Sequence, residues 1–146
     1  MKIRLTKQFS FEASHALQNY EGLCRNIHGH SYKLYVTILG EAINDENDNK
    51  NGMVMDFGEL KQVVNDNIVL PLDHSLILYR NSEFLPSLKD ENTKLVITPF
   101  QPTCENLIKD FVEKLKNKLP SKIELVALKL YETASSYAEW KKEDNL

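Results

Sequence analysis

Two stretches of the chain alternate apolar and polar residues with a period of two, which is the pattern of β-strands with one buried face. In the first, from Leu5 to His15, the apolar side of the pattern falls on the odd positions and ends on His15. In the second, from about His30 to Leu39, the apolar residues take the even positions. Strands of this kind need a second layer over their apolar face. Between them, residues 17–29 are punctuated by asparagine and glycine, so we expect a loop there.

Helical periodicity follows in two later segments. The first helix is expected to begin after Asp56, a capping residue with Glu59 three positions on, and to end at Pro71. The second is expected to start at 102–103 and to end before Pro120. The inward-facing residues would be Phe57, Leu60, Val64 and Ile68 in the first helix, and Leu107, Ile108, Phe111, Val112 and Leu115 in the second.

Strands are also expected near the end of the chain. Residues 123–132 and 137–141 are predicted to form two strands around a turn at 134–136, and a strand-like piece at 94–98 follows a charged loop at 89–94. The order strand, strand, helix, helix, strand, strand predicts an α+β fold in a single domain, residues 1–146. Its antiparallel sheet of four strands would carry both helices on one face. Four strands leave two open edges, so we expect a homo-oligomer.

Composition narrows the class of protein. The 146 residues carry a formal net charge of −3, which argues against nucleic acid or an anionic membrane as the main partner. No apolar run approaches the roughly 20 residues of a membrane-spanning helix, and the first residues are too polar for a signal peptide. We therefore expect a cytoplasmic protein whose two cysteines are free thiols.

A calcium site is one interpretation of the polar segment 41–52. Asp45, Asn47 and Asn49 match the first three ligand positions of an EF-hand loop. Lys50, however, stands where the sharp turn of that loop needs glycine, and Asp56 replaces its closing glutamate. The segment is better interpreted as a surface connection.

Three histidines can meet at one end of the two long strands. His28 and His30 are two residues apart, so both point to the same face of a strand. His15 ends the first strand on its own apolar face, and pairing of the strands would bring it to the other two. Three protein nitrogens with a vacant fourth position are typical of a catalytic zinc. Buried histidines that are merely hydrogen-bonded are the alternative.

The role of Cys24, four residues before His28, stays open among three possibilities. It could complete a closed site of one cysteine and three histidines, which would make the metal structural. It could instead move protons on a substrate bound beside the metal. It could also be a buried, inert thiol.

Other polar residues fall at the ends of predicted elements. Asp73 and His74 follow the first helix, where a carboxylate would fix the imidazole tautomer, or where His74 is simply a residue of a helix end. Glu132 ends the apolar face of a strand, so it must be paired, either with a lysine or arginine or with the guanidine-like edge of a pterin or guanine. Thr103 and Glu105 open the second helix, where capping explains both.

The order of these motifs resembles that of the 6-pyruvoyl-tetrahydropterin synthase superfamily, and most of all its bacterial branch that forms 6-carboxy-5,6,7,8-tetrahydropterin in queuosine (7-deazaguanine) biosynthesis. The resemblance spans nearly the whole chain. It rests on CRNIHGH at 24–30 with His15 upstream, GMVMDF at 52–57, LDH at 72–74, PTCEN at 102–106 and YET at 131–133. The three-residue spacing between Cys24 and His28 favours the carboxy-forming branch. Residues 79–101 are longer than the usual family pattern, and Cys104 is expected to be a packing residue.

The resemblance implies a tunnelling fold, in which trimers close a barrel and two trimers stack into a hexamer. It implies zinc held by His15, His28 and His30, with Cys24 as the base and Asp73 with His74 as a proton relay. Glu132 would anchor the pterin, with Thr103 and Glu105 lining the same pocket from a neighbouring subunit.

The implied reaction converts 7,8-dihydroneopterin triphosphate to 6-carboxytetrahydropterin, acetaldehyde and triphosphate. The sister reaction of the superfamily, which gives the pyruvoyl product, is an alternative. A non-catalytic zinc- or purine-binding module, with Cys24 as a fourth ligand, is another.

Overall fold

A computed structural model describes residues 1–88 and 93–146 of the chain. Most of the charged loop expected at 89–94 therefore lies outside the described residues. No helix in the described part is long and apolar enough to cross a membrane.

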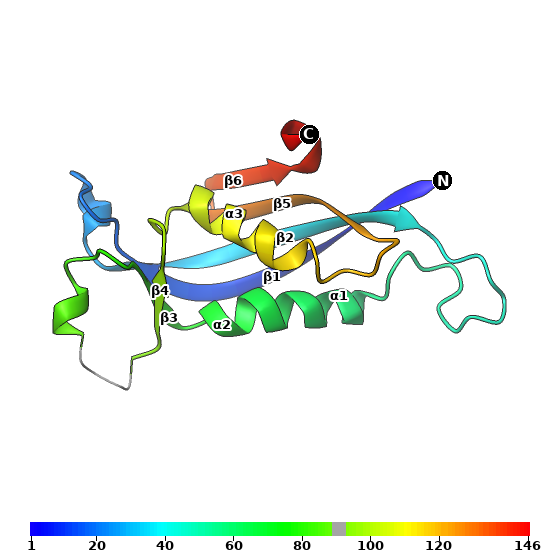
Figure 1. The fold of residues 1–146 in the computed structure, drawn as a ribbon, viewed down its shortest axis with the longest axis horizontal. Coiled ribbons are helices and arrows are strands. Elements are labelled where there is room, and N and C mark those ends of the chain that lie inside the picture. Colours follow the sequence, from blue (N-terminus) through cyan, green and yellow to red (C-terminus); the bar gives the residue numbers. More distant parts are fainter. Residues whose placement is uncertain (89–92) are drawn as a thin grey trace.

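The described strands form one mixed sheet in the order β4-β3-β1-β2-β5-β6 (Figure 1). Three antiparallel pairs, β1 with β2, β2 with β5 and β5 with β6, make up most of it. The short strand β3 runs parallel to β1, and β4 runs parallel to β3. The six strands are β1 (Lys2–His15), β2 (His28–Glu41), β3 (Ser75–Tyr79), β4 (Leu95–Thr98), β5 (Glu124–Thr133) and β6 (Ser136–Lys141).

The prediction of four antiparallel strands is therefore wrong. The strand-like piece at 94–98 joins the sheet as β4, and β3 was missed altogether. The first four residues of β3, Ser75 to Leu78, are all buried, because Ile77 faces the main core and Leu76 and Leu78 pack in a second apolar cluster. A strand that is buried on both faces is apolar throughout, so it lacks the alternation that reveals a half-buried strand.

Both helices begin where the sequence predicts them. Helix α1 (Phe57–Val64) begins after Asp56, whose side chain accepts a hydrogen bond from the N–H of Gly58. It continues through a π-helical stretch, Asn65–Val69, into α2 (Leu70–Leu72), so the helix passes Pro71 instead of ending there. Helix α3 (Cys104–Leu115) begins after Thr103, whose hydroxyl accepts from the N–H of Asn106. Short 3-10 turns occupy Leu23–Arg25, Leu85–Ser87 and Lys142–Asn145.

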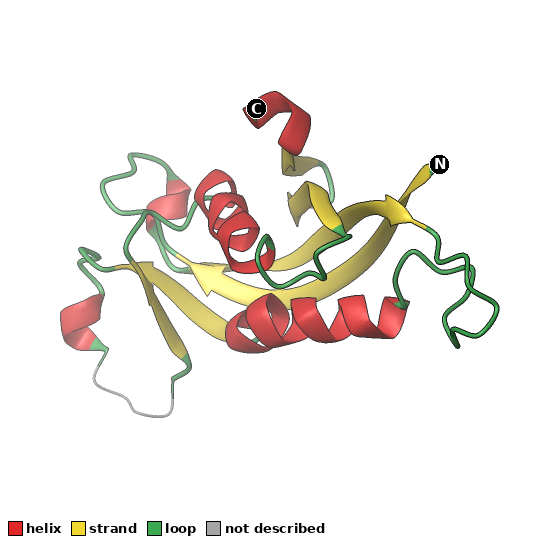
Figure 2. Cartoon of the chain, turned by 45° about the vertical axis from the view of Figure 1, so that its right-hand side comes forward, coloured by secondary structure: helices red, strands yellow, loops and turns green. Residues whose placement is uncertain are grey.

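Both main helices cover the same face of the curled sheet (Figure 2). The core between them takes the odd residues of β1 and the even residues of β2, as the alternation predicts. At its centre the ring of Phe11 stacks on that of Tyr32, with 4.9 Å between centroids. Phe57 is the exception to the predicted helix stripe, since it is 49% exposed. The histidines at the ends of β1 and β2 share the parity of this core, so they lie on the helix-covered face.

Strand β5 departs from strict alternation. Its register with β2 shifts between Thr37 and Ile38, so that Leu125 instead of Val126 is buried. A second irregularity in its pairing with β6 falls between Tyr131 and Thr133 and leaves Glu132 without a cross-strand partner. Beyond Leu130 the strand thus presents a carboxylate at the end of the core face.

Candidate active site

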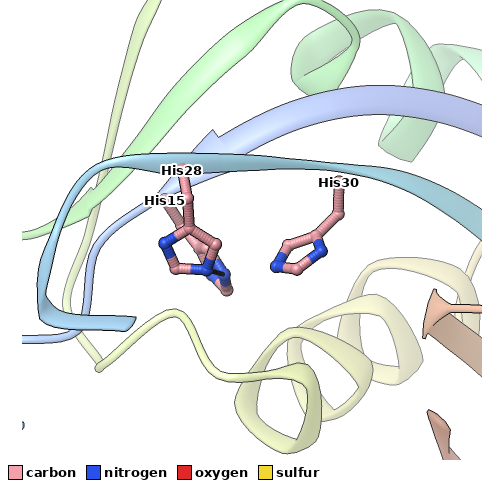
Figure 3. Close-up of side chains that lie close together, drawn as sticks. All are labelled: His15, His28 and His30. Carbon is pink, nitrogen blue, oxygen red and sulfur yellow. Dashed lines mark hydrogen bonds between the residues drawn. The ribbon is translucent and has the colours of Figure 1, made fainter. Parts of the chain in front are cut away.

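The pairing of β1 with β2 brings three imidazoles together. His15 lies directly opposite His28 in the register, and Ala13 lies opposite His30. The three ring centroids are 4.6, 4.9 and 5.1 Å apart, and the rings project from the two strands toward the start of α3 (Figure 3). One nitrogen from each ring lies within 4.8 Å of the others. The residues could therefore hold a metal ion.

The hydrogen bonds of the rings fix which nitrogens carry protons. The Nδ1–H of His15 donates to the carbonyl of Pro102 over 2.7 Å, and the Nδ1–H of His28 donates to the carbonyl of Asn26 over 2.7 Å. Because a carbonyl can only accept, each of these rings in its neutral form keeps a lone pair on Nε2. These two Nε2 atoms are 3.1 Å apart. Two acceptors at this distance need a cation between them.

Burial disfavours a proton on His15 and on His30. Burial lowers the pKa of His15 to about 4, and burial is also the main cause that lowers the pKa of His30. The buried Nε2 of His30 has no hydrogen-bond partner among the described residues. In a tetrahedral zinc site with bonds of about 2.0–2.1 Å, ligand nitrogens lie roughly 3.4 Å apart, close to the separation of the His15 and His28 nitrogens. Neutral imidazoles with converging free lone pairs fit a divalent metal ion.

His15 of the triad lines a cleft of about 350 Å³. His15, Cys24, Thr103, Glu105 and Glu132 all line it, and all belong to one chain. A neighbouring subunit is therefore not needed to bring Thr103 and Glu105 into this cleft, although we expected one to supply them. A larger hollow of about 680 Å³ lies on the open face of the sheet, but no histidine or cysteine lines it. Chemistry, not size, identifies the cleft at the triad as the candidate site.

Glu132 faces the histidines across this cleft. Its Oε1 lies 3.4 Å from the Nε2 of His15 and 3.7 Å from the Nε2 of His30, and its side chain is 28% exposed. The lysine or arginine partner that a buried carboxylate would otherwise need is not found among the described ion pairs. Glu132 thus keeps acceptor capacity for a ligand in the cleft.

The two cysteines differ in their surroundings. Cys24 is half-buried and lines the cleft, but it is not among the close ligand atoms of the triad. Cys104 is buried, its thiol donates to the carbonyl of Leu130 over 3.2 Å, and burial raises its pKa to about 11. Cys104 therefore has the environment of a packing residue.

Asp73 and His74 lie apart from Cys24. The Asp73 Oδ2 is 3.0 Å from the Nδ1 of His74, and the Asp73 Oδ1 accepts from the N–H of Glu12 over 2.8 Å. The hydrogen bond to Glu12 is the main cause that lowers the pKa of Asp73. The His74 side chain is 78% exposed and lines a separate hollow that does not include Cys24. The two adjacent side chains thus pair directly, which their spacing in the sequence does not favour, and within one chain His74 shares a hollow with His30 but does not line the cleft.

Sequence reasoning missed three contributors to the cleft. Tyr20 lines it and is 50% exposed. Gln101 holds the loop that carries Cys24, and the carbonyl of Pro102 orients His15. Its position as an aromatic residue in the loop between His15 and His28 could have drawn attention to Tyr20. A backbone carbonyl leaves no signal in the sequence.

The fold and the site together define a class: a curled mixed sheet with two helices on one face, and a three-histidine site beside a cysteine and a glutamate. The sequence model of the 6-pyruvoyl tetrahydropterin synthase family matches residues 4–143. The chain belongs to this family.

Individual relatives agree with this assignment. The 6-carboxy-5,6,7,8-tetrahydropterin synthase of Haemophilus influenzae is 33% identical over 141 residues, covering 94% of this chain and 97% of the relative. The protein of the same name from Aquifex aeolicus is 34% identical over 168 residues, covering 98% and 100%. Among solved structures, an uncharacterized protein from Wolinella succinogenes superposes with a TM-score of 0.77 at 21% identity, covering 97% and 98%.

Proposed function

We propose that this chain is a zinc-dependent lyase that converts 7,8-dihydroneopterin triphosphate and one water molecule to 6-carboxytetrahydropterin, acetaldehyde and triphosphate. The product would enter queuosine (7-deazaguanine) biosynthesis. The names of the relatives support a pterin substrate. The observation that carries the proposal is the single cleft that His15, Cys24 and Glu132 share.

The residues that would hold zinc are His15, His28 and His30. A bound zinc supplies Lewis acidity, which polarises a substrate oxygen and makes protons on the neighbouring carbon more acidic. Burial lowers the pKa of His15 and of His30, so these two rings would not first have to lose protons, which favours binding of a cation at neutral pH.

Cys24 is the proposed base. Its thiolate would take a proton from the side-chain carbon of the substrate, since it lines the cleft without belonging to the close ligand set. Glu132 would accept two hydrogen bonds from the amino group and ring nitrogen of the pterin, as a carboxylate does from a guanidine-like edge. Thr103 and Glu105 would line the rest of the pterin pocket.

Asp73 and His74 are proposed to act in a site that includes a second subunit. Their exposed position, away from Cys24 of the same chain, suits a relay that protonates the opposite side of a substrate bound to a neighbour. We also propose the trimers and hexamers that such sites require.

Mixed oligomers test this directly: Cys24→Ala and His74→Ala subunits, each inactive alone, should regain part of the activity when assembled together. Sedimentation velocity measures the assembly, and a monomer throughout would contradict it.

Product analysis tests the reaction. Incubation with dihydroneopterin triphosphate and zinc should release acetaldehyde together with triphosphate. A pyruvoyl product without acetaldehyde would instead establish the sister activity, which is the second candidate because the matching family is named for it. Absence of any turnover, with tight zinc binding, would favour a binding module.

The Cys24→Ala and Cys24→Ser variants separate base from ligand. If Cys24 is the base, zinc affinity is retained in both variants while turnover is lost. If zinc affinity collapses in the alanine variant, Cys24 is the fourth ligand and the site is closed. Zinc content by mass spectrometry of the metal and turnover by product release measure the two properties independently.

A further inference from the structure

The loop that carries Cys24 has almost no packing to hold it. No side chain from residue 17 to 27 is buried, Leu23 is 87% exposed, and the 3-10 turn Leu23–Arg25 contributes nothing to the core. One backbone bond, from the N–H of Leu17 to the carbonyl of Cys24 over 2.9 Å, closes the loop on itself. Apart from the bond of His28 to the carbonyl of Asn26, the contacts that hold this loop near the histidines are therefore polar contacts with other segments.

Gln101 makes the most specific of these contacts. Its Oε1 accepts from the backbone N–H of Gln18 over 2.9 Å, and its Nε2 donates to the backbone carbonyl of Gln18 over 2.7 Å. The side-chain amide thus pairs with both polar groups of one loop residue, as a neighbouring strand would. The two residues are 83 positions apart in the chain.

Gln101 is itself fixed to the metal site. The next residue, Pro102, is buried, and its carbonyl accepts from the Nδ1–H of His15. The carbonyl of Gln101 accepts from the side-chain amide of Asn106 over 3.0 Å and from the N–H of Thr103 over 2.8 Å, which ties it to the start of α3. Two consecutive residues, 101 and 102, therefore contact the Cys24 loop on one side and a metal ligand on the other.

We infer that Gln101 is a positioning residue, which sets the distance between the Cys24 thiol and the three-histidine site through its paired hydrogen bonds to Gln18. Its catalytic consequence rests on the proposed role of Cys24, whereas its effect on the loop does not. The side chain of Gln18 supports the loop separately, because its Oε1 accepts from the N–H of Glu83 over 3.1 Å.

The test compares Gln101→Met, which keeps the length of the side chain and loses both bonds, with Gln101→Glu, which keeps the acceptor and loses the donor. The exposed Gln62 of α1, changed to methionine, is the matched control. Hydrogen exchange of the peptide spanning residues 16–27 should accelerate roughly 10- to 30-fold in Gln101→Met, as expected for two lost neutral hydrogen bonds. Exchange in the middle of β2 and zinc content should stay at the wild-type level.

Turnover supplies the second readout. In Gln101→Met, kcat should fall about tenfold or more, since a small misplacement of a reacting group is costly, while KM changes less than about twofold. Gln101→Glu should recover part of both the exchange protection and kcat. Loop exchange in Gln101→Met equal to that in Gln62→Met would overturn the inference, and so would faster loop exchange with unchanged kcat. The exchange comparison can be made even if the wild-type chain turns over no pterin. Failure of the proposed function and failure of the positioning role of Gln101 are therefore separate results.

Discussion

Acid should destabilise the metal-free protein through the buried histidines. His15 is 1% exposed, and burial lowers its pKa from the ordinary value of 6.5 to about 4. The unfolded chain therefore takes up a proton on this residue at a higher pH than the folded chain. The pKa of His30 is also lowered, so its contribution has the same sign.

The size of the effect follows from linkage. The contribution of unprotonated His15 to the free energy of unfolding is fully present above pH 6.5, the pKa of the residue in the unfolded chain. It is lost as the pH falls toward about 4, the pKa in the folded chain. Within that window the free energy of unfolding decreases by about 1.4 kcal/mol per pH unit for one such group. Between about pH 7.5 and about pH 5, His15 alone removes roughly 2 kcal/mol. This is a large share of the stability of an ordinary domain.

Urea unfolding in the presence of a chelator measures this loss. The wild-type chain is compared with His15→Gln, which cannot titrate at this position, and with His74→Gln, a change at an exposed histidine. We expect the His15→Gln variant to lose roughly 2 kcal/mol less than the wild type over the same pH range. If the free energy of unfolding changes equally with pH in the wild type and in His15→Gln, the assignment of His15 as a buried neutral ring is refuted. A wild type that gains stability on acidification would refute it as well.

Three further predictions concern other parts of the chain. Phe11→Ala should lower the free energy of unfolding by about 3–5 kcal/mol, because it empties the centre of the core. Phe57→Ala, at an exposed position, should change it little, and urea unfolding of the two variants compares them. Thr103→Ala should cost about 1 kcal/mol through loss of the helix cap and Thr103→Ser much less, and equal losses in thermal unfolding would contradict the capping role. Glu132→Gln should raise KM for the pterin roughly tenfold or more with zinc content unchanged, and an unchanged KM would remove Glu132 from substrate binding.

The sequence was sufficient to predict those parts of the structure that are half-buried and depend on contacts close in the chain. The alternation in the first two strands predicted their faces, and the parity of His15, His28 and His30 predicted that the three rings would meet. Thr103 and Asp56 were expected at helix N-termini and are found there. These features depend on short-range periodicity or on a single pair of strands, which a linear sequence expresses directly.

The sequence was insufficient where burial is complete or contacts are distant. Strand β3 lacks alternation because both of its faces are covered, and the shift at Leu125 depends on a bulge that alternation cannot reveal. The direct pairing of the adjacent Asp73 and His74 depends on the backbone of His74, which has a φ of 60°. The contacts of Gln101 and Pro102 join segments more than eighty residues apart. Such contacts are fixed by the tertiary fold and have no local pattern.

The pairing of β1 with β2 has a consequence for how metal content is interpreted. His15 and His28 are 13 positions apart, so closing the loop between them carries a small entropic cost, and the triad is complete once these two strands pair. The cleft, in contrast, also needs α3 and the end of β5, which join the sheet through much longer loops. A partly folded chain that pairs only its first two strands would already carry the ligand set. If the triad binds zinc as proposed, bound zinc would report that one strand pair has formed, whereas pterin binding would report that the whole site is intact.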